Sequence, residues 1–201
     1  MSTAVLSVSD RLSAARAYVR DLLRDDLSPD LVFHNLLHTE NVIKASRELC
    51  ENLNVPAKEM NCVLLAACFH DVGYAYAYHG HEEKSCEIAF DYLTGTGCDG
   101  EDISTVLRCI RATQMPQNPD CLLARILCDA DMSHLASKNY LQRADKLRKE
   151  WQKVKDFDID DDNWYHQNIA FMEHHRYFTT YARKVWGKRK EKNIRTLREM
   201  I

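Results

Sequence analysis

An uninterrupted apolar segment ends in two ionisable residues, and this arrangement limits what the chain can fold into. Residues 63–69 read VLLAACF, and His70 and Asp71 follow directly. A segment that is apolar on every side belongs in a protein interior. Burying an imidazole and a carboxylate beside it costs free energy unless a partner compensates them, and a metal ion is one such partner. We expect a central buried helix here that Gly73 ends.

The rest of the chain predicts further helices joined by short loops. It has only six glycines and four prolines, and no stretch alternates β-branched with polar residues as a strand would. We therefore expect an all-α fold, a single compact helical bundle over residues 1–201. The expected helices run from a Ser9–Asp10 cap to about Leu23, then over 31–53 (with Leu37, Val42, Ala45 and Leu49 on one face), 81–93, 101–113, 122–135, from Leu141 to an acidic loop at 156–162, and over 163–186 as one long closing helix.

Composition favours a cytoplasmic protein with a small substrate. The chain of 201 residues is 45% apolar, enough for a real core, and it contains no run of 18 apolar residues that could span a membrane. With 27 basic and 30 acidic residues, the net charge of −3 argues against a nucleic-acid duplex as partner. None of the eight cysteines forms a C-x-x-C pair, so we interpret them as reduced core residues. The oligomeric state stays open, with a homodimer among the alternatives.

Two more segments bring potential metal ligands. Asp129 and Asp131 follow the apolar run ILC, and the segment FHNLLH places His34 and His38 four residues apart, on one face if all of it is helical. Imidazole nitrogens together with carboxylates suit a divalent ion such as manganese, iron, cobalt, nickel, zinc or magnesium. The alternative is a buried polar network without metal, which would have to satisfy every member internally.

The order of these residues resembles a known family. His38, the doublet His70–Asp71 and Asp131 follow the H…HD…D order of the HD superfamily of metal-dependent phosphohydrolases, over about residues 31–140. The resemblance implies that these four residues hold the metal ion, with Asp129 as the alternative to Asp131. We expect the helices of residues 141–201, outside this match, to close the domain.

The segment FHNLLHTENV is similar to the YHNxxHxxxV stretch of cyclic-nucleotide phosphodiesterases. By that resemblance, His38 binds metal and His34 is the general acid that protonates the leaving oxygen. An imidazole that titrates near neutrality can donate this proton while water activated by the metal attacks phosphorus.

Other motifs of the family are altered in this chain. Tyr74 stands where the nucleotidase and guanosine-polyphosphate branches carry the acid of HDxxE, which makes those branches less suitable models. Thr113 and Gln114 lie where the cyclic-dinucleotide branch carries histidines of its HHE and GYP signature, so a complete two-metal site is not expected.

The segment YHGHEEKS keeps a weaker second site open. His79, His81 and Glu82 lie near the position where related proteins place a second-metal or phosphate contact, although an exposed helix start would explain them equally well. We predict catalytic roles for His81, as a second candidate proton donor, and for Glu82.

Phosphate needs cationic partners, and three residues are candidates: Lys84, Arg111 and Arg176. Arg176 belongs to the segment EHHRYF with His174 and His175, on the aromatic closing helix. This segment could cap the pocket and stack a base. Isolated cations more often lie at the surface, which is the alternative for all three.

Together these features predict a metal-dependent phosphohydrolase for a small phosphoester such as a nucleotide or cyclic nucleotide. Two alternatives are an HD-fold diiron oxygenase, whose extra ligands would be His79 and His81, and a non-catalytic nucleotide sensor. The acidic segment 156–162 lacks the glycine and glutamate of an EF-hand loop, which argues against calcium binding.

Overall fold

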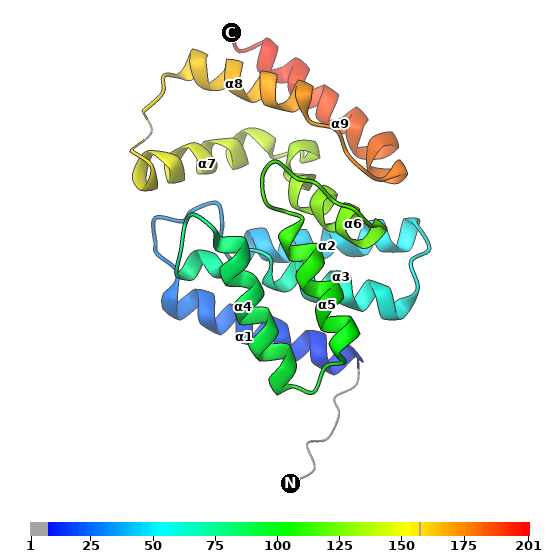
Figure 1. The fold of residues 1–201 in the computed structure, drawn as a ribbon. Coiled ribbons are helices and arrows are strands. Elements are labelled where there is room, and N and C mark those ends of the chain that lie inside the picture. The colour runs from blue at the N-terminus through cyan, green and yellow to red at the C-terminus, as the bar shows by residue number, and fades with distance from the viewer. Residues whose placement is uncertain (1–7, 157) are drawn as a thin grey trace. The chain divides into compact units, whose positions relative to one another are not determined.

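The computed structural model describes residues 8–156 and 158–201, and all its regular elements are helices (Figure 1). No strand occurs within these ranges, so the predicted all-α fold is confirmed. The expectation of a single domain stays a prediction, because the chain divides into two compact units that are described separately below. These units are Met1–Ser28 with His34–Asp131, and Pro29–Phe33 with Met132–Ile201.

The first unit is a helical bundle built around α3. Its described elements are α1 (Val8–Asp26), α2 (Leu36–Asn52), α3 (Ala57–Phe69), the 3-10 helix η1 (Val72–Ala75), α4 (His81–Gly95), α5 (Gly100–Arg111) and α6 (Leu122–Asp131). Helix α3 packs against α1, α2, α4, α5 and α6, and every residue from Asn61 to Phe69 is buried. A helix that is apolar on all sides needs neighbours on all sides, which confirms the predicted central helix.

Helix α2 begins five residues later than expected. The predicted helix started at residue 31, but the side chain of Asn35 accepts hydrogen bonds from the amides of Leu37 (3.0 Å) and His38 (3.4 Å) and so caps a helix that begins at Leu36. Leu37 is 61% exposed, so its placement on the buried face was wrong. The other three residues of that face are buried: Val42, Ala45 and Leu49.

Helix α3 ends at Phe69, four residues before Gly73, which was expected to end it. Gly73 has another role. A Cβ atom on it would lie 2.1 Å from the carbonyl oxygen of His81, and its amide donates a hydrogen bond to Ser85 Oγ at 2.9 Å. Glycine is therefore needed for η1 to pack this closely against the first turns of α4.

The other helices of this unit largely match the prediction. Helix α1 contains Ser9 and Asp10, which were expected to cap it, and continues to Asp26 instead of Leu23. Residues 1–7 lie outside the described part of the chain. Helices α4, α5 and α6 occupy the three expected apolar segments.

The second unit contains η2 (Met132–Ala136), α7 (Tyr140–Val154), α8 (Asp161–His174) and α9 (Thr180–Arg198). The single closing helix predicted over 163–186 was wrong, because the chain leaves helical geometry between α8 and α9. Thr179 caps α9 by accepting a hydrogen bond from the Ala182 amide (3.3 Å). At the other side of the break, Lys190 Nζ donates to the carbonyl oxygens of Met172 (2.7 Å) and His175 (2.6 Å).

The acidic segment is only partly a loop. Asp156 and residues 158–160 are not helical, whereas Asp161 and Asp162 already form the first turn of α8. Residue 157 lies outside the described part of the chain. Acidic residues in a first helical turn face the positive end of the helix dipole, which favours this earlier start.

The cysteines behave as expected. All eight are free, and only Cys98 and Cys121 are not fully buried. Burial raises the pKa of Cys50, Cys62 and Cys68 to about 12, so these thiols stay protonated and unreactive. Of the helices that the structure describes, none combines the length and apolarity needed to cross a membrane.

Candidate metal centre

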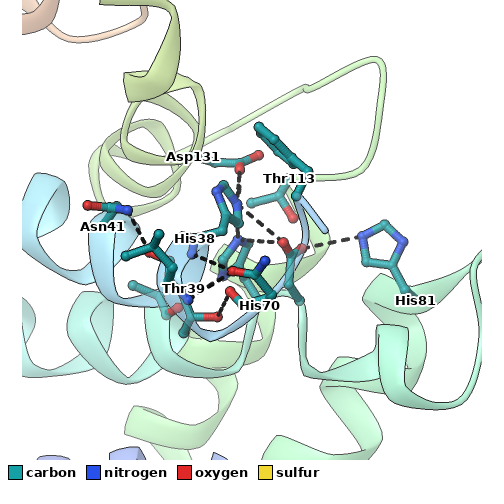
Figure 2. A network of polar contacts seen from close by, with 12 residues as sticks. His38, Thr39, Asn41, His70, His81, Thr113 and Asp131 are labelled. Atoms are coloured by element: carbon teal, nitrogen blue, oxygen red, sulfur yellow. Dashed lines mark hydrogen bonds and ion pairs between the residues drawn. The ribbon is translucent and has the colours of Figure 1, made fainter. Parts of the chain in front are cut away.

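Three helices of the first unit bring the four predicted ligands together. His38 lies in the first turn of α2, His70 and Asp71 directly follow α3, and Asp131 is the last residue of α6. His38 Nε2 lies 3.2 Å from Asp131 Oδ1 and 3.3 Å from both Asp71 Oδ2 and His70 Nε2 (Figure 2). His70 Nε2 lies 3.2 Å from Asp71 Oδ2 and 3.7 Å from Asp131 Oδ1. The Nε2 atoms of both histidines thus lie within 3.7 Å of both carboxylates.

The end of α3 fixes the orientation of His70. Its side chain is fully buried, and its Nδ1 lies 2.9 Å from the carbonyl oxygen of Ala67. A carbonyl oxygen only accepts hydrogen bonds, so Nδ1 carries the proton and donates it. The neutral imidazole then presents the lone pair of Nε2 to the cluster, which is the arrangement that metal-binding histidines commonly use.

One oxygen of Asp71 tests whether a metal ion fits. Asp71 Oδ2 is buried and accepts no hydrogen bond from the residues that the structure describes, although it lies within 3.3 Å of two imidazole nitrogens. Buried carboxylate oxygens are normally hydrogen-bonded, so an unsatisfied one points to a missing partner. Ligand atoms of His38, His70 and Asp71 all lie within 4.8 Å of one another. Two nitrogens and two carboxylates suit a borderline-to-hard divalent ion, which makes this a candidate metal site.

The buried charges strongly influence one another in the metal-free protein. Burial alone lowers the pKa of His38 and His70, but the carboxylates of Asp71 and Asp131 outweigh it and leave both values above 6.5. Burial alone raises the pKa of Asp71 and Asp131, but the facing histidines outweigh it and leave both values below 3.8. The cluster thus favours charged imidazoles and carboxylates, which a divalent ion would replace with neutral imidazole ligands.

His34 reaches the site from outside the helix. It lies before the cap of α2, so the expected helical face shared with His38 was wrong. The two rings are nevertheless close, with centroids 5.8 Å apart. The His34 ring stacks on Tyr74 at a centroid distance of 4.5 Å. Its role as general acid stays a prediction.

His81 faces the opposite side of the same carboxylate. Its Nε2 lies 3.5 Å from Asp71 Oδ1 and 3.6 Å from Glu82 Oε1, and Glu82 is 8% exposed. His79, by contrast, is exposed and makes an edge contact with the ring of Tyr78. His81 thus lies beside the cluster, and Glu82 lies next to it through His81.

The ligand geometry agrees with the comparison to known protein families. The family model described as "HD domain" matches residues 35–136, half of the chain. The chain belongs to the HD domain family. A search of curated proteins gives no match.

Solved structures show the same fold. One is a predicted HD superfamily hydrolase from an uncultured Thermotogales bacterium. It is 20% identical to this chain, with a TM-score of 0.66, and the match covers 94% of this chain and 90% of that one. Bacillus subtilis YpgQ, solved in complex with ADP, is also 20% identical, with a TM-score of 0.69, over 98% and 97%. A Lactobacillus plantarum protein is 16% identical, with a TM-score of 0.71, over 98% and 96%.

The three cations predicted to bind phosphate in this HD protein interact with glutamates or backbone carbonyls. Lys84 Nζ pairs with Glu87 at 2.8 Å, and Arg111 Nε pairs with Glu83 at 3.0 Å, both near the surface. These pairs are exposed, so a phosphate could displace the glutamates at small cost. Their role as phosphate ligands stays a prediction.

Arg176 belongs to the second unit and donates to the carbonyl oxygens of Glu173 and His175 (3.0 Å to the latter). The cluster was expected on one helix, but only His174 is helical, while His175 and Arg176 lie in the break after α8. That part of the prediction was wrong, because Lys190 and Arg176 bond to carbonyls at the helix end.

Two residues near the metal centre were not predicted as site residues. Gln117 Nε2 donates to Asp131 Oδ2 at 3.4 Å, from the loop between α5 and α6. Tyr74 lies within stacking distance of both His34 and His81. The motif comparison singled out Tyr74 only as a missing acid, and no spacing rule identifies a loop glutamine such as Gln117.

Proposed function

We propose that this HD protein is a metal-dependent phosphohydrolase that acts on a small phosphoester, a nucleotide or cyclic nucleotide. The observation that carries the proposal is the unsatisfied Asp71 Oδ2 among the Nε2 atoms of His38 and His70, with the Asp131 carboxylate on the same side. This cluster fits a divalent ion and is costly to bury for structural purposes alone.

A bound divalent ion would supply two things: a lower pKa for a coordinated water and polarisation of a phosphoryl oxygen. The protein's own residues supply the rest. His38 and His70 keep their Nε2 atoms directed at the same point, and the Ala67 carbonyl prevents the His70 ring from turning. His34 and His81 are candidate donors of the proton that the leaving oxygen requires, since both lie beside the cluster and a protonated imidazole can act as a general acid.

The nucleotide class draws support from a relative. Bacillus subtilis YpgQ, which has the same fold, was solved in complex with ADP. The resemblance of FHNLLHTENV to cyclic-nucleotide phosphodiesterases independently favours a nucleotide phosphoester. We therefore propose nucleotides and cyclic nucleotides as the first compounds to test.

The test is phosphate release, or substrate loss by chromatography, from a panel of nucleotides and cyclic nucleotides with manganese, cobalt, nickel, iron or magnesium. Activity should vanish in His70→Ala/Asp71→Ala. It should persist in a matched control, His166→Ala/Asp91→Ala, whose two side chains are exposed. If no compound is hydrolysed in any metal, or if the site variant stays as active as the control, the proposal is wrong.

A second candidate is an HD-fold diiron oxygenase, and the two faces of Asp71 favour it. Its Oδ2 faces His38 and His70, whereas its Oδ1 faces His81. A carboxylate with ligands on both sides could serve two ions. Two irons per chain together with turnover that requires oxygen would support this candidate over hydrolysis.

A further inference from the structure

Tyr74 lies between the two histidines that flank the metal centre. Its ring centroid is 4.5 Å from that of His34, at an interplanar angle of 26°, and 3.7 Å from that of His81, at 18°. Two rings stacked this closely would overlap if they shared one face, so His34 and His81 lie on opposite faces of Tyr74. We propose that Tyr74 is a positioning residue that orients the imidazole rings of both His34 and His81. This inference rests on the proposed function.

On one face, the tyrosine completes a set of contacts around His81. The Nδ1 of His81 lies 3.3 Å from the Tyr78 carbonyl oxygen, which can only accept, so Nδ1 donates. Its Nε2 then faces Asp71 Oδ1 at 3.5 Å. These two contacts fix the direction of the ring, and stacking on Tyr74 fixes its plane.

The backbone beneath Tyr74 holds it close to α4. Gly73 approaches the His81 carbonyl so closely that a Cβ would not fit, and the Gly73 amide bonds to the buried Ser85 hydroxyl. Tyr74 is the next residue along η1. Its ring therefore projects from a segment that is firmly attached to the helix carrying His81.

On its other face, the Tyr74 ring contacts His34, a residue outside the helices. His34 precedes the Asn35 cap, so the hydrogen-bond ladder of α2 does not fix its backbone. Its ring stacks on Tyr74 and lies 5.8 Å from that of His38. Stacking on a ring anchored to α4 ties this loop residue to the side of the site that holds His81.

This arrangement explains why a tyrosine suits the position where HDxxE proteins carry an acid. A carboxylate has no flat apolar faces and could not stack with two imidazoles. Loss of the aromatic ring should displace both candidate proton donors while the metal ligands remain. Since a displacement of about 1 Å in a reacting group can cost about 100-fold in rate, we expect an effect on kcat rather than on metal binding.

The test compares Tyr74→Phe, which keeps the ring, with Tyr74→Leu, which removes it. The first measurement is the NMR shift of the His34 and His81 ring protons in the metal-free protein, because it requires no activity. Both histidines should keep their ring-current shifts in Tyr74→Phe and lose them in Tyr74→Leu. In Tyr76→Leu, a control for a neighbouring exposed tyrosine, they should be unchanged.

The second measurement is hydrolysis of 3′,5′-cyclic AMP with Mn²⁺, because its ribose alkoxide needs a proton to leave. Tyr74→Leu should lower kcat by about 100-fold with little change in KM or in Mn²⁺ affinity, and Tyr74→Phe should restore the rate. If Tyr74→Leu melts early, Tyr74→Met replaces it, because methionine adapts its shape to irregular gaps.

The outcomes separate the two proposals. If the wild-type protein hydrolyses nothing but the NMR shifts change as expected, the proposed function fails and the positioning role of Tyr74 stands. If the shifts of His34 and His81 persist in the folded Leu or Met variant, or if kcat does not change, the inference about Tyr74 is overturned.

Discussion

Each unit of the molecule buries charged side chains, and two of them, Lys190 and Asp71, are satisfied differently. In the second unit, Lys190 is 6% exposed, and its ammonium group donates to the carbonyl oxygens of Met172 and His175. In the first unit, Asp71 is 8% exposed, and within the described part of the chain nothing donates a hydrogen bond to its Oδ2. A buried charge that its own chain satisfies is a structural element. A buried charge left without a hydrogen bond, beside other potential ligands, fits a bound ion.

The chemistry of the two charges explains the contrast. The ammonium group of Lys190, a residue of α9, lies at the C-terminal end of α8, where unsatisfied carbonyls and the helix dipole favour a cation. Burial, assisted by the nearby charge of Arg176, lowers the pKa of Lys190. Asp71 faces His38 and His70, which can neutralise its charge only while they are protonated. Lys190 should therefore matter for stability, and Asp71 for metal binding.

The largest expected effect is that of Asp71→Asn on metal binding. The amide removes a negative charge from the site, so affinity for Mn²⁺ should fall by more than about 100-fold, which exceeds the usual cost of altering a supporting residue. Isothermal titration calorimetry measures this directly, with Asp91→Asn at an exposed position as the control. Wild-type affinity in Asp71→Asn would contradict the assignment of the site.

Lys190→Met should destabilise the protein by about 2 kcal/mol, because the Met172 carbonyl loses its ammonium donor and the His175 carbonyl keeps only its hydrogen bond from Arg176. Urea denaturation measures the change. Lys188→Met, two residues earlier and exposed, should change the free energy of unfolding by less than about 0.5 kcal/mol. Equal effects of the two substitutions would remove the contrast between structural and binding charges.

The pH dependence of metal binding follows from the shifted pKa values. His38 and His70 titrate above 6.5, so their contribution to the stability of the metal-free protein is complete below that pH and is lost as the pH rises through their raised values. Asp71 and Asp131 titrate below 3.8. Their contribution to the stability of the metal-free protein is therefore present above that pH and is lost as the pH falls through their lowered pKa values.

The cluster therefore helps the metal-free protein most between pH 3.8 and 6.5. A metal ion must displace the histidine protons, so its affinity should rise by up to about tenfold for each unit of pH and each proton displaced. Thermal melting with and without Mn²⁺, at about pH 6 and about pH 8, measures the difference. A metal-induced rise in Tm that does not change with pH would show that the histidines are not ligands.

The smallest effect is expected for Gln117→Ala. Its amide is 3.4 Å from Asp131 Oδ2, a long hydrogen bond, so its loss should weaken Mn²⁺ binding by no more than about tenfold. Gln114→Ala, at an exposed position in the same loop, is the matched control. A loss as large as that of Asp71→Asn would show that Gln117 does more than orient Asp131.

The sequence predicts the candidate metal ligands His70 and Asp71 better than the residues around them, because the pattern that identifies these two is local. His70 and Asp71 follow an apolar run that must be buried, and their positions follow from the end of one helix. The contacts of His38 with Asp131 were predicted only through the family resemblance, since they join residues 93 positions apart. Spacing alone cannot supply such a contact.

The errors arose where a polar side chain ends a helix that hydrophobic periodicity would continue. Asn35 caps α2 and excludes His34 from it, and Thr179 starts a new helix where an unbroken one was expected. The stack of His34 and His81 on Tyr74 could not be predicted, because it depends on how closely η1 approaches α4. Periodicity contains no information about that distance.

The hydrogen bond from His70 to the Ala67 carbonyl has a consequence for how such sites tolerate change. That carbonyl is one of the last four of α3, which have no helical amide to accept from. One further turn of helix would provide such an amide, and the imidazole would lose the acceptor that selects its tautomer. The length of α3 is thus part of the ligand chemistry, and an insertion near its end could abolish binding while every ligand remains in the sequence.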